Sequence, residues 1–125
     1  MIYARADVPI YNLSVVCIAG CEFEDAKAEL YVRHRVDLGG DDGYARGRCV
    51  CHEGDVYLWV KDLERGSDFI HEVTHAATAI MELRGIPLSY ETDEVLAYLM
   101  GWLKINLLDV VYEEYKCETE AEGSE

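Results

Sequence analysis

Residues 55–83 read DVYLWVKDLERGSDFIHEVTHAATAIMEL, and this stretch decides the fold. Its first six residues are apolar after the initial aspartate, which predicts a strand buried on both faces. Ser67 or Asp68 can cap a helix that follows, and we expect this helix to end just before Gly85. The stretch therefore predicts a core strand that leads directly into a long core helix.

Shorter elements flank this unit on both sides. Alternation, helical spacing and capping residues predict a strand over 12–18, a helix over 22–35, a strand over 47–52 that forms a hairpin with 55–60, and a helix from Ser89 to Tyr115. The order of strand, helix, hairpin, helix and helix indicates the α+β class. We expect a small, mostly antiparallel sheet packed on three helices.

The chain has 125 residues, which favours one domain over residues 1–115. Residues 116–125 read KCETEAEGSE and have almost no apolar surface to bury. We therefore expect this acidic tail to be disordered.

The charge and the apolar runs exclude several classes of partner. A formal net charge of −14 repels phosphate backbones and anionic lipids, so we expect no nucleic-acid and no membrane partner. The longest apolar run, residues 95–103, is well short of the roughly 20 residues of a membrane span. No apolar segment follows a basic start at the N-terminus, so we expect a cytoplasmic protein.

Five cysteines without a signal peptide indicate reduced thiols and not a disulfide framework. Two cysteine groups could still form a second, structural zinc site, namely Cys17 with Cys21, and Cys49 with Cys51 and His52. The spacings are atypical of zinc sites, and buried free thiols are the commoner reason for cysteines in such strands.

Residues 71–75 read His-Glu-Val-Thr-His inside the predicted long helix. Two histidines four residues apart lie on one helical face, so their rings can converge on one metal ion. Glu72 lies about 100° round the helix and can reach a water molecule beside that ion. This arrangement is typical of a hydrolytic zinc site, in which the carboxylate moves the proton of the attacking water.

A catalytic zinc site needs a third protein ligand. No histidine follows His75, so the third ligand cannot be a later histidine. The carboxylates at the start of the last predicted helix are the candidates, namely Glu91, Asp93 and Glu94.

The motif and its spacing resemble a known group of enzymes. His-Glu-x-x-His is followed after 18 residues by Glu94, which begins a Glu-x-x-Ala segment. This pattern resembles the gluzincin metallopeptidases, and the short chain resembles minigluzincins, their minimal catalytic cores. Residues 44–105 also resemble small phage-encoded proteins with a Val-x-Leu-Trp-type strand and an acidic-x-x-Ala-Tyr-x-x-Gly-Trp helix.

The resemblance implies a zincin-like fold and a zinc-dependent metallopeptidase. It implies one Zn²⁺ per chain, held by His71, His75 and Glu94, with Glu72 as general base and a protein or peptide as substrate. An edge strand near 49–52 would pair with the substrate backbone. The chain departs from the pattern at Tyr98, where many gluzincins have an acidic residue that supports a ligand histidine.

Two further points stay open at this level. Tyr44, Tyr57 and Tyr90 are unranked candidates for a hydroxyl that would stabilise the oxyanion. The alternative function is a non-catalytic, zinc-containing accessory protein that captures another protein. The last helix is apolar nearly all round from Val95 to Val111, so it could also form a homodimer.

Overall fold

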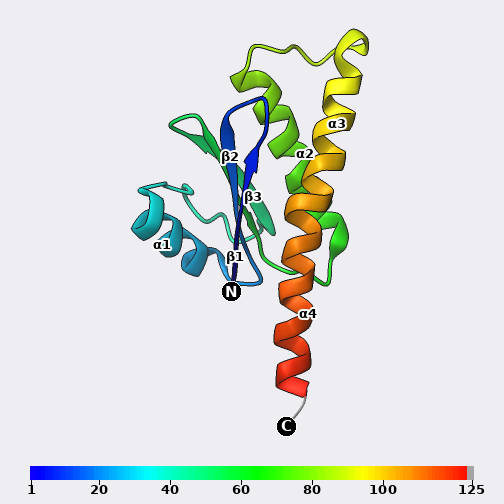
Figure 1. The fold of residues 1–125 in the computed structure, drawn as a ribbon. Coiled ribbons are helices and arrows are strands. Elements are labelled where there is room, and N and C mark those ends of the chain that lie inside the picture. The colour runs from blue at the N-terminus through cyan, green and yellow to red at the C-terminus, as the bar shows by residue number, and fades with distance from the viewer. Residues whose placement is uncertain (124–125) are drawn as a thin grey trace.

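A computed structural model describes residues 1–123 (Figure 1). The elements, in chain order, are β1 (Ile2–Val8), β2 (Leu13–Ala19), α1 (Phe23–His34), β3 (Gly47–His52), β4 (Asp55–Val60), α2 (Gly66–Leu83), the 3₁₀ turn η1 (Tyr90–Thr92), α3 (Asp93–Leu103), the π-helical segment η2 (Lys104–Leu108) and α4 (Asp109–Gly123). The α+β class is confirmed: a four-stranded, mostly antiparallel sheet packs with three helices, the last of which is the continuous run from η1 to α4.

The strands lie in the order β1-β2-β4-β3. β2 and β4 are the central pair and run parallel, whereas β1 and β3 each pair antiparallel with a central strand. The predicted hairpin of β3 and β4 is confirmed, with His52 opposite Asp55 across its turn. This order leaves β3 as an edge strand, and α2 packs against both β3 and β4.

Strand β1 was not predicted from the sequence. It alternates buried and more exposed residues along its length, as a strand with one covered face does. Two of its inward residues are Ala4 and Ala6, whose small side chains give a weak apolar signal. The strand forms because pairing with β2 buries these small residues under the long C-terminal helix, which contacts β1 through η2 and α4.

Two apolar cores lie on opposite faces of the sheet. The larger one joins the sheet to α2 and the long C-terminal helix through residues such as Phe69, Ile80 and Leu103. The smaller one lies under α1 and includes Leu30 and Trp59. The residues of β4 are buried from Val56 to Val60, as the uninterrupted apolar run predicts for a strand covered on both faces.

The C-terminal helix is continuous from Tyr90 into α4, which ends at Gly123, and its 32 residues from Tyr90 to Ala121 make it longer than the apolar run suggested. It is long and apolar enough to cross a membrane by length and composition, contrary to the sequence-based expectation. Mostly buried core helices of soluble proteins pass the same test, whereas 22% of the apolar window of this helix is buried, where one face packs on α2 and β1. By length and composition alone, the helix is therefore weak evidence for a membrane span.

The predicted disordered tail also differs from the structure. Helix α4 continues through 116–123, and only residues 124–125 lie outside the described part of the chain. The hydroxyl of Thr119 donates to the backbone oxygen of Tyr115, one turn earlier. Lysine, glutamate and alanine in this segment are good helix formers, so the helix extends without burying apolar surface.

Candidate metal centre

The two motif histidines lie on the exposed face of α2. Their rings meet edge to face, with centroids 4.7 Å apart and an angle of 79° between the planes. The Nε2 atoms of His71 and His75 are 3.1 Å apart. Two nitrogens bound to one tetrahedral ion at about 2.0–2.1 Å would lie roughly 3.3 Å apart, so this spacing suits a shared ion as well as a hydrogen bond between the rings.

Glu72 points from the same helix towards the sheet and is only 6% exposed. Its Oε1 atom lies 4.0 Å from Nε2 of His71, and its buried Oε2 atom has no hydrogen-bond partner among residues 1–123. Burial raises the pKa of this carboxyl, while His75 and then His71 oppose the rise. A buried carboxylate with a free oxygen beside two histidines is able to receive a proton or a cation.

Gly47, the first residue of β3, makes room for Glu72. A Cβ atom at this position would lie 2.6 Å from Cγ of Glu72 and 3.0 Å from the backbone oxygen of Trp59. Because the oxygen belongs to the backbone of β4, it cannot move aside as a side chain can. A glycine at position 47 therefore lets the glutamate fold against the edge strand.

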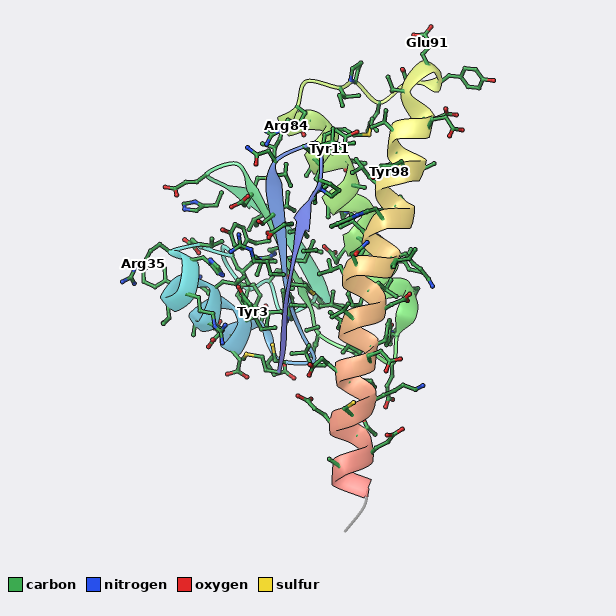
Figure 2. The ribbon with its side chains drawn as sticks, in the orientation of Figure 1. Tyr3, Tyr11, Arg35, Arg84, Glu91 and Tyr98 are labelled. Carbon is green, nitrogen blue, oxygen red and sulfur yellow. The ribbon has the colours of Figure 1, made fainter. Side chains whose placement is uncertain are left out.

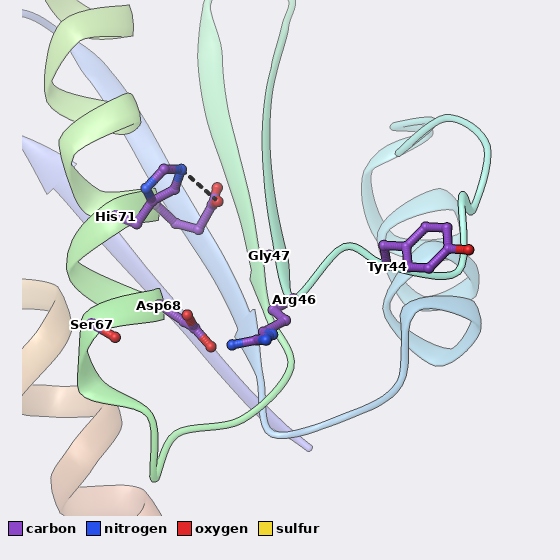
Figure 3. A pocket seen from close by; sticks show the side chains of 7 residues that line it. Tyr44, Arg46, Gly47, Ser67, Asp68 and His71 are labelled. Atoms are coloured by element: carbon purple, nitrogen blue, oxygen red, sulfur yellow. Dashed lines mark ion pairs between the residues drawn. The ribbon is translucent and has the colours of Figure 1, made fainter.

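Two cavities flank Glu72 along the gap between α2 and β3. The first, of about 450 Å³, is lined by residues that include Arg46, Ser67 and Asp68 (Figure 3). The second, of about 470 Å³, is lined on the strand side by Cys49 and Cys51. Gly47, His71 and Glu72 line both cavities, so together they form a groove along β3 with the glutamate at its middle.

The donor atoms of His71, Glu72 and His75 all lie within 4.8 Å of one another, and this group could bind a metal ion. The predicted third ligand, Glu94, is not part of the group. It lies in the first turn of α3, is exposed, and lines neither cavity of the groove. The fallback ligand, Glu91, lies in η1 at the far tip of the long helix (Figure 2).

The reason for this separation is the path of the chain after α2. The long helix packs on the side of α2 that carries core residues such as Val73 and Ile80, and its own Leu99 and Leu103 face that core. The histidines lie on the exposed side of α2, which faces the groove beside β3. Tyr98 is also exposed on α3, and the structure records no hydrogen bond from it to either histidine.

The structure ranks the three tyrosines that the sequence left unranked. Tyr57 is buried on the far face of the sheet, where its ring contacts His34. Tyr90 is exposed in η1 and lines neither cavity. Tyr44 lines the first cavity, but its ring lies well away from His71 in the loop before β3 (Figure 3). Of these three tyrosines, Tyr44 is therefore the one that lines the groove, with its hydroxyl directed away from His71.

The sequence did not predict that residues of β3 line the metal site. Gly47, Cys49 and Cys51 alternate along β3, and this period of two was a signal that they share one face. Burial raises the pKa of Cys49 to about 12, with smaller contributions from Cys51 and Glu72. In the described part of the chain, the cysteines and His52 form no second group of three or more metal donors, and all five thiols are free.

Comparisons with protein-family models, with curated proteins and with solved structures find no match for this chain. The assignment of the site therefore rests on its residues and their geometry.

Proposed function

We propose that this protein is a zinc-dependent metallopeptidase in which Glu72 is the general base. One observation carries the proposal: Glu72 is buried, has an oxygen without a hydrogen-bond partner in the described chain, and lies beside His71 and His75 at the middle of a groove. A metal site that served only to hold the fold would not need a glutamate in this place. The buried charge has a cost that a catalytic role explains.

The donor set is compatible with zinc. Imidazole nitrogens suit zinc as well as copper, iron and nickel, and the spacing of the two Nε2 atoms suits the tetrahedral geometry of zinc. We propose one zinc ion per chain, held by His71 and His75. When bound there, the ion would polarise a substrate carbonyl and lower the pKa of water towards about 7.

Glu72 would transfer the proton of the attacking water to the leaving amine. The carboxylate, whose Oε1 atom lies 4.0 Å from Nε2 of His71, would take a proton from the attacking water, and the same carboxyl would then deliver that proton to the leaving amine. Burial raises the pKa of Glu72, which makes its carboxylate a better proton acceptor than an exposed one. The reaction consumes one water molecule for each peptide bond that is cleaved.

The edge strand supports a protein or peptide as the substrate. Among the strands of residues 1–123, β3 pairs only with β4, so its outer edge could pair with an extended chain. The groove that contains Glu72 follows this strand. Pairing of main chain with main chain gives little preference for side chains, so we expect broad sequence specificity.

The test compares the wild-type protein with Glu72→Gln, both loaded with zinc and incubated with a cell lysate. New terminal peptides, identified by mass spectrometry, should appear only with the wild type. Glu118→Gln is the control, because Glu118 is exposed on α4 and lines neither cavity of the groove. Cleavage that persists in zinc-loaded Glu72→Gln would exclude this residue as the base, and no cleavage by the wild type would refute the peptidase.

A non-catalytic binding protein is the second candidate, and one observation favours it. Large apolar side chains are exposed along the outer face of the long helix, namely Tyr98, Ile105 and Val110. Such a face could hold a second copy of the chain or another protein. Sedimentation analysis would test the homodimer: dimers that dissociate in Ile105→Lys, together with no peptidase activity in the zinc-loaded wild type, would favour this function.

A further inference from the structure

We propose that the thiol of Cys49, on edge strand β3, is the third protein ligand of the metal ion held by His71 and His75. This inference rests on the proposed metal site and replaces Glu94, which the fold does not bring to the groove. The resulting set of two imidazoles and one thiolate would leave a fourth position for water or substrate beside Glu72.

The side chain of Cys49 shares the face of β3 that meets α2. Gly47 is in contact distance of Glu72 on this face, and side chains two residues apart on a strand point the same way. Cys49 packs against the core between the sheet and α2, whereas its neighbour Val50 packs on the opposite core. Cys49 therefore projects into the cavity that His71, Glu72 and His75 line from the other side.

Position along the groove selects Cys49 over Cys51. The contact between Gly47 and Glu72 aligns the two elements. A strand rises about 3.3 Å per residue, so Cys49 is roughly 7 Å and Cys51 roughly 13 Å further along. A helix rises about 1.5 Å per residue, so His75 is about 5 Å and Glu82 about 15 Å beyond Glu72.

These positions place Cys49 near the level of His75 and Cys51 near the level of Glu82. The side chains of Cys49, His75, Cys51 and Glu82 all line the second cavity, which agrees with this alignment. The buried oxygen of Glu72 that lacks a partner in the described chain marks the same place independently.

Binding needs the thiol and the histidine rings to approach one another, and its proton balance is simple. The thiol lies outside the tight group of His71, Glu72 and His75, and both histidines are exposed on the side of α2 that lines this cavity. On binding, the S–H bond of Cys49 breaks, a sulfur–metal bond forms and the proton leaves to water. No change of oxidation state is involved.

X-ray absorption of the zinc-loaded full chain tests the inference without measuring activity. Sulfur and nitrogen ligands are distinguishable, because zinc–sulfur bonds are about 2.3 Å and zinc–nitrogen bonds about 2.0–2.1 Å. We expect one sulfur in the wild type and in Cys51→Ser. Cys49→Ser and Cys49→Ala should lose the sulfur and bind zinc at least about tenfold more weakly.

Each result has a distinct meaning. A wild type that binds one zinc ion without sulfur overturns this inference and leaves the proposed peptidase site intact. Sulfur that remains in Cys49→Ser and disappears in Cys51→Ser also overturns it. A wild type that binds no zinc overturns both proposals. The wild-type spectrum decides the matter even where a variant fails to fold, and circular dichroism in chelator reports the folding of each variant.

Discussion

Gly47 and Glu72 touch across the groove between β3 and α2. The absent side chain of the glycine is what allows the carboxyl of Glu72 to lie against the edge strand, since a Cβ atom would approach Cγ of Glu72 to 2.6 Å. The same contact fixes the level of the helix relative to the strand. It therefore sets which strand residues face the two histidines.

Gly47→Ala should displace Glu72 and destabilise the protein by about 1–3 kcal/mol, the usual cost of overpacking. The neighbouring backbone oxygen of Trp59, 3.0 Å from the new Cβ, cannot yield. Urea unfolding measures the change. Gly101→Ala is the matched control, because a Cβ there meets nothing within 4 Å and alanine in a helix should stabilise by about 0.5–1 kcal/mol. Equal stability of Gly47→Ala and wild type would contradict the contact.

Zinc binding should depend on His71 and His75 and not on Glu94. We expect one zinc ion per chain in the wild type and in Glu94→Ala, and its loss in His71→Ala and His75→Ala. Metal analysis after dialysis gives the stoichiometry. Zinc at 100 times its dissociation constant should raise the unfolding free energy by about 2.7 kcal/mol.

The control for this prediction is His34→Ala. His34 forms a hydrogen bond with the hydroxyl of Tyr3 on the other side of the sheet, so this substitution should not change zinc binding. Loss of zinc in Glu94→Ala would instead show that α3 moves towards the groove.

Glu72 should make stability fall as the pH rises when a chelator keeps metal away. Burial raises the pKa of its carboxyl, so the folded state keeps the proton to a higher pH than the unfolded chain. The unfolding free energy then decreases from the unfolded pKa, about 4.3, up to the raised folded pKa. Glu72→Gln should lack this decrease, and should therefore gain stability over the wild type between pH 4 and pH 7.

Urea unfolding at both pH values, with chelator present, measures this gain. The exposed carboxyl of Glu82 provides the control, since Glu82→Gln should follow the pH dependence of the wild type. A constant difference between Glu72→Gln and the wild type over this range would show that Glu72 ionises in the folded state as it does in the unfolded chain.

The π-helical segment should carry much of the attachment of the long helix. Leu107 is fully buried there, whereas Ile105 in the same segment is 63% exposed. Leu107→Ala should cost about 2–5 kcal/mol of unfolding free energy, and Ile105→Ala should change it by no more than about 0.5 kcal/mol. Thermal and urea unfolding compare the two. Similar small effects of both changes would mean that the helix is not docked on the sheet.

The sequence predicted those parts of the fold that have strong local signals. The uninterrupted apolar run of β4 and the helix that carries the motif were both identified, because burial and helical spacing are visible in the residues themselves. Strand β1 was not predicted, because its small alanines become buried only when the strand pairs with β2. The helix over residues 116–123 was not predicted, because helix propensity there outweighs the lack of apolar surface.

Some parts of the candidate site could likewise be predicted from the sequence, and others could not. The pairing of His71 with His75 follows from helix geometry alone, and the two side chains lie together in the structure. Glu94 was inferred from spacing along the chain, but spacing does not determine which side of α2 a later helix covers. The contribution of β3 depends on the order of strands in the sheet, which no local pattern in 47–52 reveals.

The open edge at β3 also has a colloidal consequence. An unpaired strand that can accept an extended peptide can equally accept the β3 strand of another molecule, which is the first step of aggregation. The formal charge of −14 opposes this encounter by mutual repulsion. Salt screens such repulsion within about 8–10 Å at physiological strength, so the protein should tolerate high concentration best at low ionic strength.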